Sequence, residues 1–245
     1  MYTVQMMAGT NATSGQPMNA GTFLVSTGNT ETFIYSDTCY ANGTCPDAPI
    51  YKPAASSTYI KGPNNGVTQA STGMRMKSDT AFDTLCLGSG GETDRLCLDH
   101  MEFNMVNSID AKDWQQVFYQ DAYATNGIFG LGMVPNDTYS NQSSSFLARA
   151  VALGQIDEYE YSFQMAPNDT VGSQLVLGKY DGTYTDKTKW INMAVGSNGW
   201  EGNVTGTWVD NTTCFPDNST EYSANFETGY PYIGMPADVF ENMAD

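Results

Sequence analysis

The 245-residue chain is strongly acidic, with 10 Lys and Arg against 27 Asp and Glu and a net charge of −17. Such a surface repels phosphate backbones and anionic lipid headgroups, which excludes nucleic acids and acidic membranes as partners. Only 15% of residues are charged, while Gly, Ser, Thr and Asn abound. This composition favours turns and short strands, so the sequence predicts an all-β protein long enough to bury a full core.

Eight Asn-x-Ser/Thr triplets and five cysteines favour the secretory pathway and an extracellular or cell-surface location. The acceptor residues of these triplets are Asn11, Asn42, Asn136, Asn141, Asn168, Asn203, Asn211 and Asn218. No basic and apolar leader follows Met1, and no run approaches the roughly 18 apolar residues of a membrane span. We therefore expect an internal piece of a longer secreted glycoprotein precursor with no membrane span in this segment.

The first part of the chain predicts three strands in order. Alternating apolar residues over 2–6 are typical of a strand, and the Gly-, Asn- and Ser-rich residues 9–20 predict a turn. An apolar run over 22–25 predicts a buried strand that breaks at the Ser-Thr-Gly turn 26–28. Residues 32–35 predict the next strand.

Two cysteine pairs predict two short disulfide loops. Cys39 and Cys45 flank a five-residue turn that can close as a disulfide in an oxidising compartment. A metal site there would need further ligands nearby, and the sequence supplies none. Cys86 and Cys97 bracket a Gly-rich hairpin tip and predict a second disulfide. The fifth cysteine, Cys214, has no evident partner.

The middle of the chain carries a glycine-rich motif, a predicted helix and two tryptophans. Residues 125–132 end in Gly-Ile-Phe-Gly-Leu-Gly. Residues 143–155 fit a short helix with a Ser cap, apolar i,i+4 pairs and a Gly stop. Trp190 and Trp200 are adequately explained as two core aromatics.

The x-Thr-Gly turn at 26–28 returns at 227–229, again after a strand-like segment. The chain resembles the pepsin-like aspartic protease family in an ordered set of features. These are the paired turns, the small disulfide loop, the Ser-Ser-Thr-Tyr segment 56–59 and the glycine-rich motif at 125–132.

The resemblance implies a bilobal pepsin-like double β-barrel. Its N-terminal lobe would span residues 1–165, and 166–245 would begin a C-terminal lobe that is truncated in this chain. The same resemblance implies that 125–132 form a strand beneath the first turn, whose glycines allow close backbone approach, that 157–163 form the return strand into the lobe crossover, and that 175–181 open the second lobe.

The resemblance also implies that both catalytic aspartates are replaced, by Ser26 and by Glu227. Two aspartates sharing a proton perform peptide hydrolysis in this family, and a serine hydroxyl cannot share that proton. Glu227 adds a methylene in a site where 1 Å is costly. We therefore expect no catalytic residues and no cofactor or metal. The turn residues to which the resemblance gives a bracing role are Thr27, Gly28, Thr228 and Gly229.

Three further family features are altered. The flap, a hairpin that carries a Tyr in the family, falls at residues 66–73 and contains no aromatic residue. Phe33 stands for the family's Trp, and Asn126 for an Asp. The resemblance pairs Cys214 with a cysteine beyond the end of this sequence, and a free thiol is the alternative.

Three functions remain open at this point. The first is an inactive pepsin-like module that binds other proteins, copies of itself or a peptide in its inter-lobe cleft. The second is a weak acid-pH endopeptidase in which Glu227 is a lone base. The third is an unrelated β-rich adhesion or lectin-like domain, which predicts that 26–28 and 227–229 lie far apart. A Cys97–His100 dyad and a calcium site at 181–186 are less favoured than a surface histidine and a solvated turn.

Overall fold

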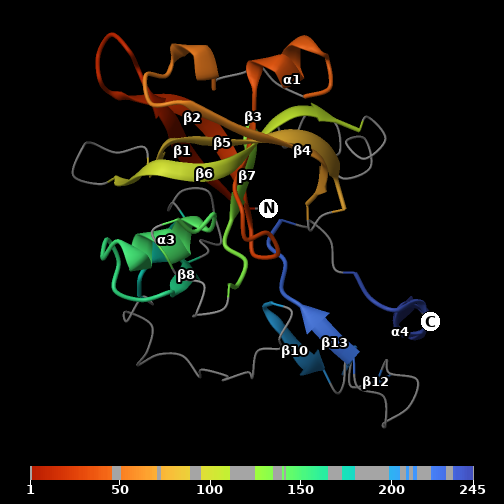
Figure 1. Cartoon of the computed structure of the whole chain (residues 1–245). Helices are drawn as coiled ribbons and strands as arrows, with labels where there is room; N and C mark the ends of the chain where they lie inside the picture. Colours follow the sequence, from red (N-terminus) through yellow and green to blue (C-terminus); the bar gives the residue numbers. More distant parts are fainter. Residues whose placement is uncertain are drawn as a thin grey trace.

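Figure 1 shows the computed structural model, in which one large bent sheet is followed by smaller two-stranded sheets. The structure describes residues 2–45, 51–70, 73–88, 95–110, 125–134, 140, 142–164, 173–179, 199–204, 208–209, 212–213, 222–229 and 234–244. The predicted all-β class is confirmed, because strands form most of the described regular structure.

Seven strands form the large sheet, in the order β1-β2-β7-β3-β6-β5-β4, and an additional β1–β5 pairing closes it into a barrel. These strands are β1 (Thr3–Thr10), β2 (Pro17–Ser26), β3 (Phe33–Tyr35), β4 (Ile60–Gln69), β5 (Arg75–Leu87), β6 (Leu96–Ile109) and β7 (Gly127–Gly130). Most neighbours are antiparallel, but β2 runs parallel to β7, and β3 runs parallel to β6. The parallel pairs lie in the middle of the strand order, and the first x-Thr-Gly turn begins at the end of β2.

Strand β2 is buried on both faces, which explains its unbroken apolar run. Phe23 and Val25 point into the main core, together with Phe103, while Leu24 points to a second cluster that contains Phe33. All of these side chains are at most 4% exposed. A strand covered on both sides has no polar face, so successive residues are all apolar rather than alternating.

Three short helical segments lie against the barrel, namely α1 (Asp37–Ala41), the 3-10 turn η1 (Pro53–Ala55) and α3 (Phe146–Ala152). Helix α4 (Ala237–Ala244) lies away from the barrel (Figure 1), and its Val239 packs against Val204 of β10 and Tyr222 of β13. Helix α3 confirms the predicted helix but is shorter, because Ser145 rather than an earlier Ser caps it. Helix α1 was not predicted. Its five residues begin after Ser36, whose hydroxyl accepts from the Cys39 amide.

Several predicted boundaries were wrong. The turn predicted over 9–20 is confined to 11–16, because Pro17 already starts β2. The hairpin predicted around 66–73 is longer, since β4 begins at Ile60 and β5 continues to Leu87. The strand predicted from 157 begins later, at Tyr161.

The second half of the chain contributes three described two-stranded sheets. Their strands are β8 (Tyr161–Gln164) with β9 (Gln174–Leu177), β10 (Glu201–Val204) with β13 (Tyr222–Asn225), and β11 (Trp208–Val209) with β12 (Thr212–Thr213). Strand β13 carries the chain into the second x-Thr-Gly turn, which Figure 1 places near the end of the large sheet. No helix in the described ranges is long and apolar enough to cross a membrane.

Candidate functional site

The two x-Thr-Gly turns meet. Ser26 Oγ lies 3.0 Å from Glu227 Oε1 and 3.2 Å from Oε2, and the hydroxyl donates its proton to the carboxylate. Ser26 is fully buried at the end of β2, whereas Glu227 is half-buried after β13. The adhesion or lectin-like interpretation required these turns to lie far apart, so it is wrong.

Flanking residues brace the two turns against each other. The Thr228 amide donates to Thr27 Oγ1 at 3.0 Å, and the Thr27 hydroxyl donates to the Phe226 carbonyl. In the matching bond, the Thr228 hydroxyl donates to the Val25 carbonyl at 2.8 Å. The two threonines therefore hold the turns together by backbone-directed bonds that do not involve Ser26 or Glu227.

Asn29 saturates the Ser26 hydroxyl from within the first turn. Its backbone N–H lies 3.1 Å and its Nδ2 2.7 Å from Ser26 Oγ, and both donate to that oxygen. Ser26 Oγ thus donates one hydrogen bond and accepts two, which uses its proton and both of its lone pairs. Asn29 is 7% exposed, so water cannot readily compete for these bonds.

Glu227 is fixed by its own turn. The Gly229 N–H donates to Glu227 Oε1 at 2.6 Å. A Cβ on Gly229 would lie 2.9 Å from that oxygen and 3.2 Å from Ser26 Cβ. A side chain at this position would therefore push the Glu227 carboxylate away from its present place beside Ser26.

The glycines of β7 let the strand pack directly beneath the first turn. The Leu131 amide donates to the Ser26 carbonyl at 2.8 Å, and the Gly132 amide donates to the Asn29 carbonyl at 2.6 Å. A Cβ on Gly130 would lie 2.4 Å from a backbone oxygen, so no side chain can be accommodated there. This strand fixes the position of the Ser26 backbone.

The model of the eukaryotic aspartyl protease family matches residues 9–245. The chain belongs to this family. A search of the curated proteins finds no significant match. The family match confirms the resemblance from which the pepsin-like fold was predicted, and it spans both of the turns that meet at Ser26 and Glu227.

The hairpin of β4 and β5 occupies the place in the chain where the family's flap was predicted. At its tip the Ala70 amide donates to the Met74 carbonyl at 2.9 Å, and both side chains are buried. They pack in the second cluster with Val106 and Ile109. The sequence has no aromatic residue between 60 and 81, so this tip offers no aromatic side chain.

Aromatic residues of the second half pack close to the site. Trp200 Nε1 donates to the Leu131 carbonyl at 3.2 Å, and its ring meets that of Tyr161 edge-on at 5.3 Å. Burial raises the pKa of the Tyr161 phenol, and Tyr159 and Glu227 add to the rise, so Tyr161 stays protonated. Sequence reasoning singled out neither Tyr161 nor Asn29, because neither type of residue at these positions carries a catalytic pattern.

The disulfide predictions are confirmed. Cys39 bonds to Cys45, and Cys86 bonds to Cys97, which faces it directly in the β5–β6 ladder. A Cys97–His100 dyad is ruled out, because the sulfur is already bonded. His100 is instead exposed, with its ring stacked on Phe82 at 4.9 Å. No three His, Cys, Asp or Glu side chains of the described residues gather as a metal site.

Of the predicted glycan acceptors, the described residues include Asn11, Asn42 and Asn203. The other predicted sites lie outside the described residues, namely Asn136, Asn141, Asn168, Asn211, Asn218, Cys214, Trp190 and the turn 181–186.

Proposed function

We propose that this chain is a catalytically silent pepsin-like module of a secreted glycoprotein, which acts by binding proteins rather than by cutting them. The observation that carries the proposal is the direct hydrogen bond from Ser26 to Glu227. It joins the two positions where, in the family's motif, the catalytic aspartates stand.

Peptide hydrolysis by this fold needs two carboxylates, one as base and one as acid, with a water between them. Ser26 has no acidity to share a proton, and its hydroxyl touches Glu227 directly at 3.0 Å. In this contact the Ser26 proton is donated to Glu227, so the pair holds one carboxylate and no second acid. The added methylene of Glu227 is what lets its carboxylate reach the shorter serine.

Ser26 is also unsuited to act as a nucleophile with Glu227 as its base. An attacking oxygen must aim a lone pair at the substrate carbonyl, but both lone pairs of Ser26 Oγ accept N–H donors of Asn29. The residue is 0% exposed. Attack would require breaking these bonds and opening the turn, so the arrangement favours a structural role.

The second candidate is weak acid-pH hydrolysis with Glu227 as a lone base. Its Oε1 accepts from the Gly229 amide and the Ser26 hydroxyl, so a proton from water would have to go to Oε2, and no second acid is at hand to protonate the substrate oxygen. We therefore favour the silent module.

An acid-pH peptide cleavage assay tests the choice. The wild type is compared with a Ser26→Asp/Glu227→Asp double variant and with Glu227→Gln as a matched control. We expect no cleavage by the wild type or by Glu227→Gln. Cleavage by the wild type that Glu227→Gln abolishes would establish the second candidate. Recovery in the double variant would show that the loss lies in these two side chains, because Asn29 can donate to an aspartate as it does to serine.

The binding role rests on what the site retains. The threonine brace holds the turns together without the acid pair, so the family's inter-lobe cleft can persist as a surface for a peptide, another protein or a second copy. The two disulfides and the Asn-x-Ser/Thr triplets support secretion. Cross-linking of the secreted full-length protein, followed by mass spectrometry, would identify the partner. Contacts confined to contaminants would count against a binding role.

A further inference from the structure

Two glycosylation triplets of the first half differ in how their polar atoms are used. One runs from Asn11 to Thr13 at the β1–β2 hairpin tip, and the other from Asn42 to Thr44 after α1. Residue exposure alone would favour Asn42, because Asn42 is exposed and Asn11 is half-buried. The hydrogen bonds of the two triplets point the other way, because they leave the Asn11 triplet open and engage the Asn42 triplet.

The Asn11 triplet leaves its reactive atoms open. Asn11 Oδ1 accepts from the Thr13 amide at 2.8 Å and from the Ser14 amide at 3.0 Å, which forms a tight Asx turn. This turn uses the carbonyl end of the amide and turns Nδ2 away from it. Within the described part of the chain, neither Asn11 Nδ2 nor the Thr13 hydroxyl makes a hydrogen bond, and Thr13 is exposed.

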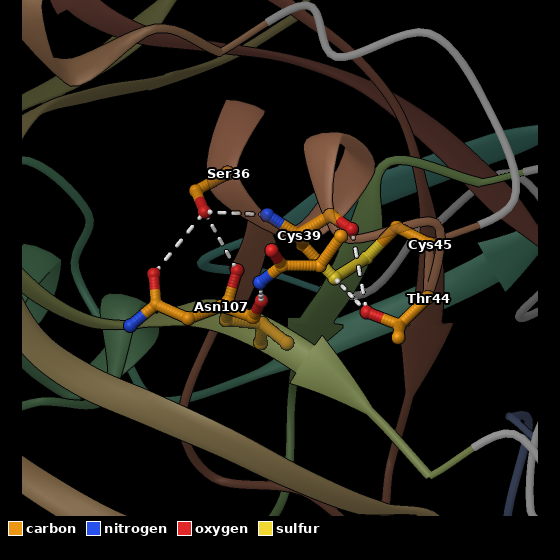
Figure 2. The surroundings of a disulfide bond; sticks show 7 residues. Ser36, Cys39, Thr44, Cys45 and Asn107 are labelled. Atoms are coloured by element: carbon orange, nitrogen blue, oxygen red, sulfur yellow. Dashed lines mark hydrogen bonds between the residues drawn. A yellow bond between two sulfur atoms is a disulfide. The ribbon is translucent and has the colours of Figure 1, made fainter.

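The Asn42 triplet is closed by the first disulfide, which Figure 2 shows with Thr44 and Asn107 beside it. Asn42 Nδ2 donates to the Asn107 carbonyl at 3.3 Å. The Thr44 hydroxyl donates to the Cys39 carbonyl at 3.3 Å and lies 3.5 Å from Cys39 Sγ. Both side-chain groups that glycosylation requires are therefore engaged, Thr44 within the loop that Cys45 closes and Asn42 by Asn107 on the adjacent strand β6.

The backbone of this triplet is also fixed. The Asn42 amide donates to the Thr38 carbonyl, and the Gly43 amide donates to the Tyr40 carbonyl. Gly43 adopts a left-handed conformation, with φ of +67°. The triplet is thus wound into the end of α1, and a transferase would have to unwind it to reach Nδ2.

We propose that Asn11 carries an N-linked glycan, and that the Cys39–Cys45 disulfide prevents modification of Asn42. The proposal rests on the secreted location proposed above. The co-reactant is a lipid-pyrophosphate-linked oligosaccharide. Asn Nδ2 bonds to the first sugar carbon, the carbon–oxygen bond to the pyrophosphate breaks, and the amide proton passes to a base. The lipid pyrophosphate is the leaving group.

The disulfide can close early enough to matter. Its cysteines are six residues apart in sequence, and the entropic cost of closing so short a loop is small. Closure of the disulfide itself needs no distant part of the fold, whereas the bond from Asn42 Nδ2 to Asn107 forms only when β6 packs beside the loop. Disulfide closure places Thr44 against Cys39 while Asn42 lies between the two cysteines.

Site occupancy in the secreted full-length protein tests the proposal. The glycans are removed by an amidase in heavy-oxygen water, which marks each formerly modified Asn as a labelled Asp for mass spectrometry. We expect nearly full occupancy at Asn11, little at Asn42, and loss of one glycan's mass from the Asn11→Gln variant. In a Cys39→Ser/Cys45→Ser variant, occupancy at Asn42 should rise several-fold. The same variant with Thr44→Ala should lose that gain.

A second measurement avoids dependence on the folding of the variant. Wild-type protein is labelled in cells given a membrane-permeant thiol during synthesis, and occupancy at Asn42 should again rise. High glycan occupancy at Asn42 in untreated wild type would overturn the proposal that the disulfide prevents modification of Asn42. So would an unchanged occupancy at Asn42 after both the cysteine substitutions and the thiol treatment. If Asn11 carries no glycan while other sites do, the proposal that Asn11 is glycosylated is overturned. If no site carries a glycan, both this proposal and the proposed secreted location are overturned. The cleavage assay tests the catalytic part of the proposed function independently of glycosylation.

Discussion

Thr27 and Thr228 bind each other's turns across 201 residues of sequence, through the Thr228 amide and the Thr27 hydroxyl at 3.0 Å. The Thr228 hydroxyl adds a bond to the Val25 carbonyl at 2.8 Å. Each bond ends on a backbone group, so the brace does not depend on the identity of residues 26 and 227. The brace is therefore in place with a serine at position 26 and a glutamate at position 227.

Thr27→Val should destabilise the protein. The substitution keeps the shape of the side chain but leaves the Thr228 amide and the Phe226 carbonyl unpaired, at a cost of about 1–3 kcal/mol. Urea unfolding of the purified protein measures this change. The control is Thr27→Ser, which keeps the hydroxyl and should lie closer to the wild type. Equal stability of the Val and Ser variants would show that the brace contributes nothing.

Gly127→Ala should disrupt the packing of β7 against β3. A Cβ at this position would lie 2.1 Å from the Phe33 carbonyl oxygen and 2.5 Å from the ring of Phe23, both of which are held in the core. Overpacking of this kind costs about 1–3 kcal/mol or more. Thermal unfolding should show a clearly lower midpoint.

Gly234→Ala is the matched control for this substitution. Nothing lies within 4 Å of a Cβ at Gly234, so its effect should stay within about 0.5 kcal/mol. A midpoint for Gly127→Ala that equals that of this control would contradict the packing argument.

Glu102 should make folding stability depend on pH. Burial raises the pKa of Glu102, the like charge of Glu31 raises it further, and Arg149 opposes the shift. The folded chain therefore holds this proton more tightly than the unfolded chain does. Stability should fall as pH rises from the ordinary Glu value of about 4.3 through the raised pKa.

Urea midpoints of Glu102→Gln, measured across this pH range, test the assignment. The variant cannot ionise at this position, so its decline with rising pH should be shallower than that of the wild type. Glu31→Gln removes the like charge and should reduce the slope in part. Parallel slopes for all three proteins would mean that Glu102 does not titrate differently on folding.

Local sequence patterns predicted much of the barrel, because apolar runs, turn residues and closely spaced cysteines lie in short stretches of the chain. The apolar run ending at Ser26 became the end of β2, and the two cysteine pairs formed the two disulfides as predicted. Helix α1 was missed, because its five residues carry little propensity. It is held by the Ser36 cap and the disulfide around it.

The fold family and the residue types at positions 26 and 227 could be read from the sequence alone, because the turn and glycine motifs lie in consecutive residues. What the Ser26 and Glu227 side chains contact depends on the folded chain. The hydrogen bond from Ser26 to Glu227, its saturation by Asn29 and the closure of the Asn42 triplet depend on distances between atoms. Hydrogen bonds act over about 3 Å, and no spacing along the chain specifies separations that fine.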